Sequence, residues 1–275
     1  MSNSEVTDET LPIDLRLAED ELERHREHIT EFIRETIAAA GADGAVLGLS
    51  GGIDSTLTAF LASEALGPDR LRGLVMPSEV NRDENTSDAE RVARTLEIEY
   101  DVIEIEPIVE KLLDAFPKAK DDRTAVGNAR VRTRGVLNYL VANHENRLVL
   151  GTGNRTEALA GYYTKYGDQA VDCNPIGNLY KLQVRQLAAY ADVPEDLIEK
   201  TPSAGMWAGQ TDEEELGVGY DTLDRVLALY VDSPLSKAAT TRTLDVDPAL
   251  VERVEELHTR SEHKRHMPPA PDPLD

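Results

Sequence analysis

This sequence of 275 residues contains a single cysteine and no long apolar stretch. The single Cys173 can form no internal disulfide and no cysteine metal cluster. No segment approaches the roughly 18 uninterrupted apolar residues of a membrane-spanning helix, and the opening MSNSEVTDET lacks the basic and apolar run of a signal peptide. With 40% hydrophobic and 29% charged residues, the composition is typical of a soluble globular protein, which we expect in the cytoplasm with no membrane partner.

Basic residues are also scarce. There are 29 Lys and Arg against 52 Asp and Glu, a net charge of −23, which argues against a nucleic acid or an anionic membrane as partner. Only 8 of the basic residues are lysines, and 21 are arginines. This composition suggests a salt-rich, halophilic cytoplasm, because a carboxylate surface repels itself in dilute salt but is screened within ~3 Å at 1 M ionic strength. A merely acidic mesophilic protein is the alternative.

Short apolar runs alternate with helical patterns along the first part of the chain. We expect a disordered arm at residues 1–12 and a long amphipathic helix at 15–40, ended by Gly41. The apolar runs are 45–49, 71–76, 100–105 and 147–151, with helices expected between them near 55–66, 86–96 and 125–143. This alternation predicts an α/β, Rossmann-like three-layer fold: a central parallel sheet, helices on both faces, and binding loops at the carboxyl ends of the strands.

After Gly151 the chain becomes richer in Gly, Asn, Asp and Tyr, which indicates a segment that faces a substrate rather than more sheet. Helices are expected again near 180–191, 220–230 and 248–261. Because there is no internal repeat and no linker, we expect one domain over residues 13–269, followed by a flexible, proline-rich tail at 270–275.

The strongest local pattern is GLSGGIDS, Gly48 to Ser55, between the first expected strand and the next helix. Its glycines let the backbone approach a ligand closely, and the N–H groups at the helix start suit a phosphate. No G-x-x-x-x-G-K-[ST] string is present, so this is not the P-loop of kinases and GTPases. Ser50, Ser55 and Thr56 supply hydroxyl groups, and Asp54 is a candidate ligand of Mg²⁺ bound together with phosphate. The alternative is a plain turn with Asp54 as a helix cap.

A second glycine string, GTGNRT at residues 151–156, also follows an expected strand. It does not predict a dinucleotide-binding fold. Thr156 stands where G-x-G-x-x-G needs its third glycine, and no strand, helix and ribose-binding acid follow at the required spacing.

Several further strings occur in a fixed order along the chain. They are NARVRTR at 128–134, GTGNRTE at 151–157, TKYGD at 164–168, TPSAGMWAGQTDEEELG at 201–217 and SEHKRH at 261–266. SGGIDS resembles the pyrophosphate loop of the ATP pyrophosphatase superfamily, and the set as a whole looks like that of the ammonia-dependent NAD synthetases. The resemblance covers nearly all of residues 22–269.

The resemblance assigns roles to individual residues. The ATP-binding residues that it implies are Gly48, Leu49, Ser50, Gly51, Gly52, Ile53, Asp54, Ser55, Thr152, Lys181 and Ser203. Those implied for deamido-NAD are Arg132 (aligned in preference to Arg130), Lys165, Asp172, His263 and Lys264. Asp54 and Glu157 are the implied Mg²⁺ ligands. Asp54, Asp172 and Lys181 are expected in catalysis, Asp172 as the carboxylate that draws in ammonium and accepts its proton.

By the same resemblance, the enzyme amidates deamido-NAD with ammonia and ATP, through an acyl-adenylate, to give NAD, AMP and pyrophosphate. Free ammonia is the expected nitrogen source, because the chain has no room for a glutamine-hydrolysing domain. Family members are homodimers, so we expect a homodimer here. The alternatives are a GMP-synthetase-like or tRNA-thiolating enzyme of the superfamily, and a nucleotide-sensing protein with degenerate chemistry. A thiolating enzyme would need a basic surface and reactive cysteines.

The charge of the chain generates a prediction about salt. Thermal stability should rise across a KCl series, because the Debye length falls from ~30 Å at 0.01 M to ~3 Å at 1 M and carboxylate repulsion weakens. NAD formation, measured in the same samples, should persist at 1 M KCl. A melting temperature that is flat or falls with salt, with activity lost at 1 M, would contradict the halophilic interpretation.

Overall fold

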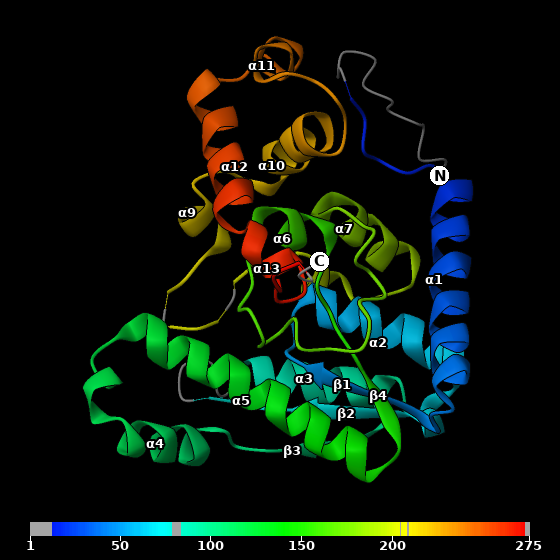
Figure 1. Ribbon diagram of the computed structural model, residues 1–275. Helices are drawn as coiled ribbons and strands as arrows, with labels where there is room; N and C mark the ends of the chain where they lie inside the picture. Colours follow the sequence, from blue (N-terminus) through cyan, green and yellow to red (C-terminus); the bar gives the residue numbers. More distant parts are fainter. Residues whose placement is uncertain (1–12, 79–83, 204, 208, 273–275) are drawn as a thin grey trace.

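A four-stranded parallel sheet lies at the centre of the computed structural model, which describes residues 13–78, 84–203, 205–207 and 209–272. The strands are β1 (Gly44–Leu49), β2 (Leu71–Val75), β3 (Glu99–Val102) and β4 (Arg147–Leu150), in the order β3-β2-β1-β4 (Figure 1). All three pairings are parallel, so every carboxyl end lies at the same edge. The arm expected at 1–12 and the last residues of the tail, 273–275, lie outside the described residues.

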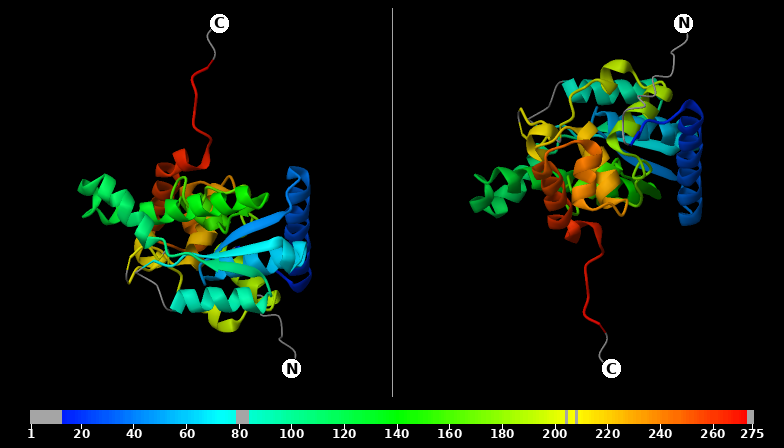
Figure 2. Two further views of the ribbon diagram at one scale, coloured as in Figure 1. Left: turned by 90° about the horizontal axis from the view of Figure 1, so that it is seen from below. Right: turned by 90° about the horizontal axis from the view of Figure 1, so that it is seen from above.

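Helices cover both faces of the sheet because its side chains alternate between two apolar cores. Ala45, Leu47 and Leu49 of β1 belong to the larger core, whereas Val46 belongs to a second core on the opposite face. The larger core is covered by α1 (Glu19–Ala40), α2 (Ile53–Leu66), α3 (Glu84–Thr95), α7 (Lys181–Tyr190) and α8 (Glu195–Ile198). The second core is covered by α5 (Arg123–His144), against which α4 (Glu106–Ala115) packs. Figure 2 shows α3 and α5 on opposite sides of the sheet, which confirms the expected three layers.

The C-terminal helices form a third core of their own beyond the carboxyl edge of the sheet (Figure 1). They are α9 (Asp212–Leu216), α10 (Tyr220–Val226), the π-helix η4 (Leu227–Val231), α11 (Lys237–Leu244), α12 (Pro248–Arg260) and α13 (Glu262–Arg265). This core includes Ala160 of α6 (Arg155–Ala160) and Tyr180, the residue before α7. Two 3₁₀ turns, η1 (Pro68–Arg70) and η3 (Pro117–Ala119), complete the regular structure of the described residues.

Element boundaries differ from the expected ones in a few places. The strand expected at 100–105 ends at Val102, because Ile105 is buried as the residue that leads into α4. The first helix begins at Glu19 rather than at residue 15, since Ala18 has an extended backbone. Helices α4 and α11 were not expected from the sequence. Among the described residues, no helix combines the length and the apolarity needed to cross a bilayer.

Two glycines that end helices allow the packing of the C-terminal helices to be tested. Gly161 ends α6 with φ +69°, and Gly41 ends α1 with φ +63°. A Cβ atom on Gly161 would lie 1.9 Å from the Cβ atom of Ser261, whereas a Cβ atom on Gly41 would meet nothing within 4 Å. Both positions share the left-handed backbone, and only Gly161 has a close neighbour.

We expect Gly41→Ala to lower the free energy of unfolding by about 1–2 kcal/mol, the cost of a left-handed backbone for a residue with a Cβ atom. Gly161→Ala should cost roughly 1–3 kcal/mol more, because Ser261 must also move. Urea unfolding of the two variants measures the difference. Equal losses would contradict the close contact between α6 and the start of α13.

Candidate active site at the carboxyl edge of the sheet

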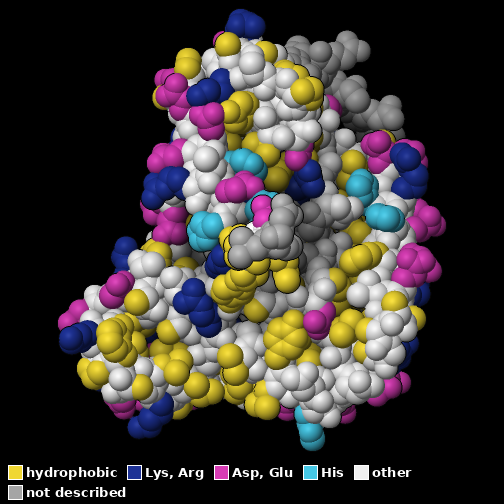
Figure 3. All heavy atoms as spheres, in the orientation of Figure 1, with side chains coloured by type: hydrophobic (Ala, Val, Ile, Leu, Met, Phe, Trp, Pro, Cys, Tyr) yellow, Lys and Arg dark blue, Asp and Glu magenta, His cyan; other side chains and the backbone are white. Residues whose placement is uncertain are grey.

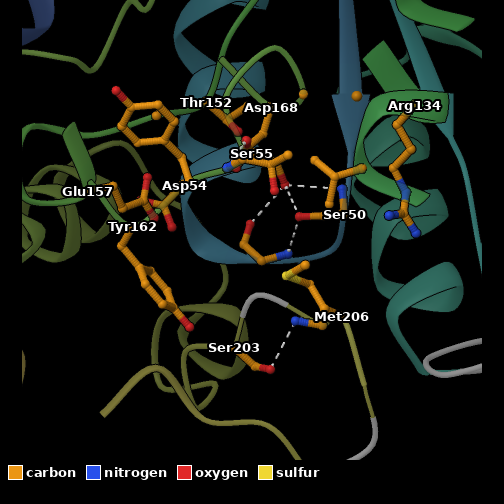
Figure 4. Close-up of a pocket in the computed structure, with 18 of the residues that line it drawn as sticks. Ser50, Asp54, Ser55, Arg134, Thr152, Glu157, Tyr162, Asp168, Ser203 and Met206 are labelled. Carbon is orange, nitrogen blue, oxygen red and sulfur yellow. Dashed lines mark hydrogen bonds between the residues drawn. The ribbon is translucent and has the colours of Figure 1, made fainter. Parts of the chain in front are cut away.

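A pocket of about 580 Å³ opens where β1, β2 and β4 end. Its walls come from the loop after β1, one face of α5, residues 161–164 and 167–169, residues 200–203 and 205–207, and Lys264. In Figure 4 the labelled side chains come from each of these segments and point toward a common space; Lys264 is not labelled there. The pocket therefore lies where parallel α/β sheets usually bind their ligands.

The loop after β1 is held in shape by its own serines. The Ser50 N–H donates to Ser55 Oγ at 3.2 Å, the Gly52 N–H donates to Ser50 Oγ at 3.2 Å, and the two serine hydroxyls lie 2.9 Å apart. Gly51 has φ +74°, a backbone that favours glycine. The loop leads directly into α2, a helix of 14 residues, so the positive end of that helix faces the pocket. This geometry suits a phosphate group.

A lysine between two carboxylates forms the centre of the pocket. Lys181 is 2% exposed, and its Nζ atom makes an ion pair with Asp54 Oδ2. Asn154 Nδ2 donates to the other oxygen of Asp54 at 2.9 Å. Asn154 also caps α6: its side chain accepts the Glu157 N–H at 2.9 Å, and its own N–H donates to Glu157 Oε2 at 3.2 Å. Asn154 thus places Asp54 and Glu157 beside each other.

Neighbouring charges in this centre shift the pKa values of Glu157 and Lys181. Burial, and next the charge of Asp54, raise the pKa of Glu157 well above its usual value. Burial alone would lower the pKa of Lys181, but the carboxylates of Asp54 and Glu157 outweigh it and raise the pKa. The raised pKa favours the protonated form of Glu157, and a cation bound beside it would favour the carboxylate instead.

The donor set fits Mg²⁺ bound together with phosphate. Among the described residues, no group of three or more His, Cys, Asp or Glu side chains could hold a metal by itself. Two carboxylates are available, Asp54 and Glu157, and Mg²⁺ commonly binds through one or two carboxylates while phosphate oxygens and water fill its other positions. The centre fits a metal that arrives with its nucleotide.

The rest of the pocket contributes isolated charges. Arg134 Nε donates to the Met76 carbonyl oxygen at 3.0 Å, and burial lowers its pKa to about 10. Asp168 accepts the Thr164 N–H at 2.8 Å; enclosure by the surrounding protein raises its pKa to about 6, although its side chain is open to the solvent of the pocket. Lys264 Nζ donates to two carbonyl oxygens, those of Gly161 and Tyr163, at 2.7 Å each.

Most of the residues that the sequence predicts for ATP and metal lie in this pocket. Those in its lining are Gly48, Leu49, Ser50, Gly52, Ile53, Asp54, Ser55, Thr152, Glu157, Lys181 and Ser203, and Lys264 joins them. Gly51 belongs to the same loop without lining the pocket. The roles of these residues stay predictions.

Three of the residues predicted for deamido-NAD form a separate cluster outside the lining. Arg132 Nη2 donates to the Lys165 carbonyl oxygen at 3.2 Å, and Lys165 Nζ donates to the His263 carbonyl oxygen at 2.5 Å. Arg132 and His263 are exposed. The neighbouring Arg130 pairs with Glu106 at 2.6 Å, which agrees with the preference for Arg132.

Asp172 is not in the lining either. Its Oδ2 atom accepts the Val149 N–H at 2.7 Å, and its Oδ1 atom accepts the Tyr139 hydroxyl at 3.0 Å. The carboxylate therefore ties β4 to α5, and this geometry does not support its expected part in capturing ammonium.

Sequence reasoning missed the face of α5 that lines the pocket. Asn128, Val131, Gly135 and Asn138 all lie on that face, together with Arg134. Their spacing of three and four residues is a helical stripe, and its two asparagines are the signal that could have revealed it. The sequence pattern does not say which face of α5 is turned toward the sheet. The fold shows that this stripe faces the pocket.

Comparisons with known proteins agree with one another. The family model described as NAD synthase matches residues 25–268. The chain is 62% identical, over 264 residues, to an NH(3)-dependent NAD(+) synthetase of Halobacterium salinarum, with 96% of this chain and 98% of that protein covered. It is 49% identical, over 246 residues, to an NH(3)-dependent NAD(+) synthetase of Hyperthermus butylicus, with 89% of each covered.

Two solved structures match almost the whole fold. An NMN synthetase from Francisella tularensis superposes with a TM-score of 0.80 at 36% identity, with 91% of this chain and 98% of that chain covered. An NH3-dependent NAD synthetase from Campylobacter jejuni superposes with a TM-score of 0.75 at 33% identity, with 91% and 99% covered.

Proposed function

The chain belongs to the NAD synthase family, and from this membership we propose that it catalyses the ATP-dependent amidation of deamido-NAD with ammonia, giving NAD, AMP and pyrophosphate. The observation that carries the proposal is the 62% identity to an NH(3)-dependent NAD(+) synthetase over nearly the full length of both proteins. The pocket supports it, because it combines a phosphate-binding loop with a buried Asp54–Lys181 ion pair. We place the protein in the cytoplasm, in keeping with its composition and its single cysteine.

The reaction has two steps. The nicotinate carboxylate attacks the α-phosphorus of ATP, and pyrophosphate leaves with the electrons of the broken P–O bond. Ammonia then attacks the acyl carbon of the adenylate, and AMP leaves. The loop from Ser50 to Ser55 would bind the leaving pyrophosphate through its N–H and hydroxyl groups, and Lys181 would balance its charge. The protein's contribution is alignment and charge neutralisation.

Asp54 and Glu157 would hold Mg²⁺. A bound Mg²⁺ would neutralise the charge that develops on the pyrophosphate oxygens. The support is that Asn154 holds the two carboxyl groups beside each other, where a bound cation would oppose the burial and the charge of Asp54 that raise the pKa of Glu157.

The carboxylate that we propose to accept the proton of ammonium is Asp168. It lines the pocket, and its raised pKa, about 6, suits a group that takes up a proton near neutral pH. We prefer it to Asp172, whose oxygens are engaged by Val149 and Tyr139. Asp172 could still orient deamido-NAD through its position between β4 and α5.

A homodimer would complete the deamido-NAD site. Exposed apolar side chains on α4 and α5 include Phe116 (62% exposed), Val136 (68%) and Leu140 (63%), and hydrophobic side chains gather over this part of Figure 3. Arg132 precedes Val136 and Leu140 at intervals of four residues, so it lies on the same side of α5. We propose that a second copy covers this surface and that deamido-NAD binds at its edge, beside Arg132, Lys165 and His263, and reaches Lys264 in the pocket lining.

The proposed reaction is tested by choice of acid substrate. The protein is supplied with ATP, Mg²⁺, ammonium and one of three acids: deamido-NAD, nicotinate mononucleotide or xanthosine monophosphate. NAD should form together with equal amounts of AMP and pyrophosphate. Nicotinate mononucleotide is included because of the similarity to the Francisella NMN synthetase, and preferential amidation of that acid would overturn the choice of deamido-NAD.

Substituting Asp54 tests its part in the reaction. Asp54→Asn keeps the shape and removes the charge, so pyrophosphate release should fall by about 100-fold or more while the protein stays folded. Glu64→Gln, near the far end of the same helix, should leave the rate close to wild type. Near wild-type turnover of Asp54→Asn at saturating Mg²⁺ would contradict the metal assignment.

The dimer is tested by its mass in solution. Light scattering should give twice the 30.3 kDa of one chain, and Leu140→Glu should halve the value, because a buried charge opposes apolar association. Phe32→Glu on α1, where the replaced side chain is 38% exposed, serves as control and should remain dimeric. A monomeric wild type, or a dimeric Leu140→Glu, rules out this interface.

A further inference from the structure

Asp224 of α10 is a carboxylate with no role in the reaction described above. Its side chain is 0% exposed, and it does not line the pocket. One carboxylate oxygen accepts the Thr156 hydroxyl at 2.5 Å, and the other accepts the Leu182 N–H at 2.9 Å. Asp224 therefore joins the C-terminal helices to α6 and α7, the two helices that begin at the centre of the pocket.

The partners of Asp224 are sequence neighbours of the pocket residues. Thr156 precedes Glu157 on α6, and Leu182 follows Lys181 on α7. The Thr156 hydroxyl also accepts the Lys181 N–H at 2.9 Å. Three hydrogen bonds thus connect the two helix starts: the Lys181 N–H donates to the Thr156 hydroxyl, and that hydroxyl and the Leu182 N–H donate to the carboxylate of Asp224. Both N–H groups are ones that a helix start leaves without a partner of its own.

A second side chain of α10 contacts Lys181 directly. The ring of Tyr220, one turn before Asp224, lies 5.4 Å from Lys181 Nζ, and the Tyr220 hydroxyl donates to Asp212 Oδ2 at 2.8 Å. Helix α10 therefore supports Lys181 at both its ammonium group and its backbone.

Stability alone does not account for a carboxylate at this position. A buried carboxylate is costly even with hydrogen bonds, and no ion pair of Asp224 is found among the described residues. Burial raises its pKa to about 6, although the hydrogen bonds from Thr156 and Leu182 oppose that shift. What the carboxylate contributes is geometric: its two hydrogen bonds fix α6 and α7 relative to each other.

We propose that Asp224 is a positioning residue, which fixes Glu157 and Lys181 at the separation that Mg²⁺ and the phosphates of ATP require. The inference rests on the proposed function and adds to it a determinant outside the pocket. Displaced by even about 1 Å, the two side chains would bind the metal nucleotide less well and align it poorly, and such losses are commonly 10- to 100-fold.

A matched control lies next to this network. Asp232, after the π-helix, pairs with Arg155 and accepts the Tyr180 hydroxyl. Arg155 and Tyr180 directly precede Thr156 and Lys181, so Asp232 joins the same two helices to the same C-terminal core. None of these three residues lines the pocket. Asp232→Asn therefore removes a comparable tie without touching the hydrogen bonds beside Glu157 and Lys181.

The experiment compares Asp224→Asn, Asp232→Asn and the wild-type protein at temperatures below their melting points. It measures the melting temperature, the binding of Mg²⁺ with ATP by calorimetry, kcat, and the KM for deamido-NAD. Asp224→Asn should lower Mg²⁺–ATP affinity and kcat by about 10- to 100-fold with little change in the KM for deamido-NAD. Asp232→Asn should lower the melting temperature and leave the other values close to wild type. Equal losses in both variants, or none in Asp224→Asn, would overturn the proposal.

Variants of Thr156 decide the matter if Asp224→Asn does not fold. Thr156→Ser keeps the hydroxyl and should behave as wild type, whereas Thr156→Val removes it at similar size and should lose affinity and kcat. Where both single variants fold, Asp224→Asn and Thr156→Val together should cost little more than either alone, since they break one network. Wild-type values in Thr156→Val would overturn the proposal. If the wild-type protein forms no NAD, the proposed function fails, and Mg²⁺–ATP binding still tests Asp224.

Discussion

The meeting of three charged side chains in one enclosed space is the constraint on which the arrangement of this protein depends. Two carboxylates, Asp54 and Glu157, share the single ammonium of Lys181, which is almost completely buried. Each of the three comes from the start of a different helix, α2, α6 or α7, so three helix starts must converge at one point. The parallel sheet brings two of these starts together, because α2 follows β1 and α6 follows β4 at the same edge. The start of α7 is joined to α6 by the hydrogen bond from the Lys181 N–H to the Thr156 hydroxyl.

The strands and the loop after β1 could be predicted from the sequence, because their signals lie within short segments of the chain. The strands at 45–49 and 147–151 are apolar runs that lead into glycine-containing loops, and the GLSGGIDS loop carries its own turn chemistry and hydroxyls. Both features are visible without tertiary structure. The end of β3 was missed because apolar residues at 103 and 105 continue the run beyond Val102. Helix α4 was missed although its apolar residues at 108, 109, 112 and 113 recur at helical spacing.

The parts of the site that depend on how distant segments meet could not be predicted. Arg134 enters the pocket because α5 turns that face toward the sheet, while Arg132, two residues earlier, points away and meets Lys165 and His263. Asp168 and Asp172 illustrate the same limit. They are four residues apart in one polar segment, yet one lines the pocket and the other anchors β4 to Tyr139.

The hydrogen bonds around Asp224 bear on how such a protein can change over evolutionary time. The three charged side chains of the pocket centre, Asp54, Glu157 and Lys181, lie within residues 54–181, whereas the carboxylate that joins α6 to α7 belongs to residue 224. The C-terminal helices are thus no independent module that could be exchanged freely between relatives. A chimaera with a foreign C-terminal segment would keep every pocket-centre residue and still lose their alignment, unless positions 156 and 224 were inherited together.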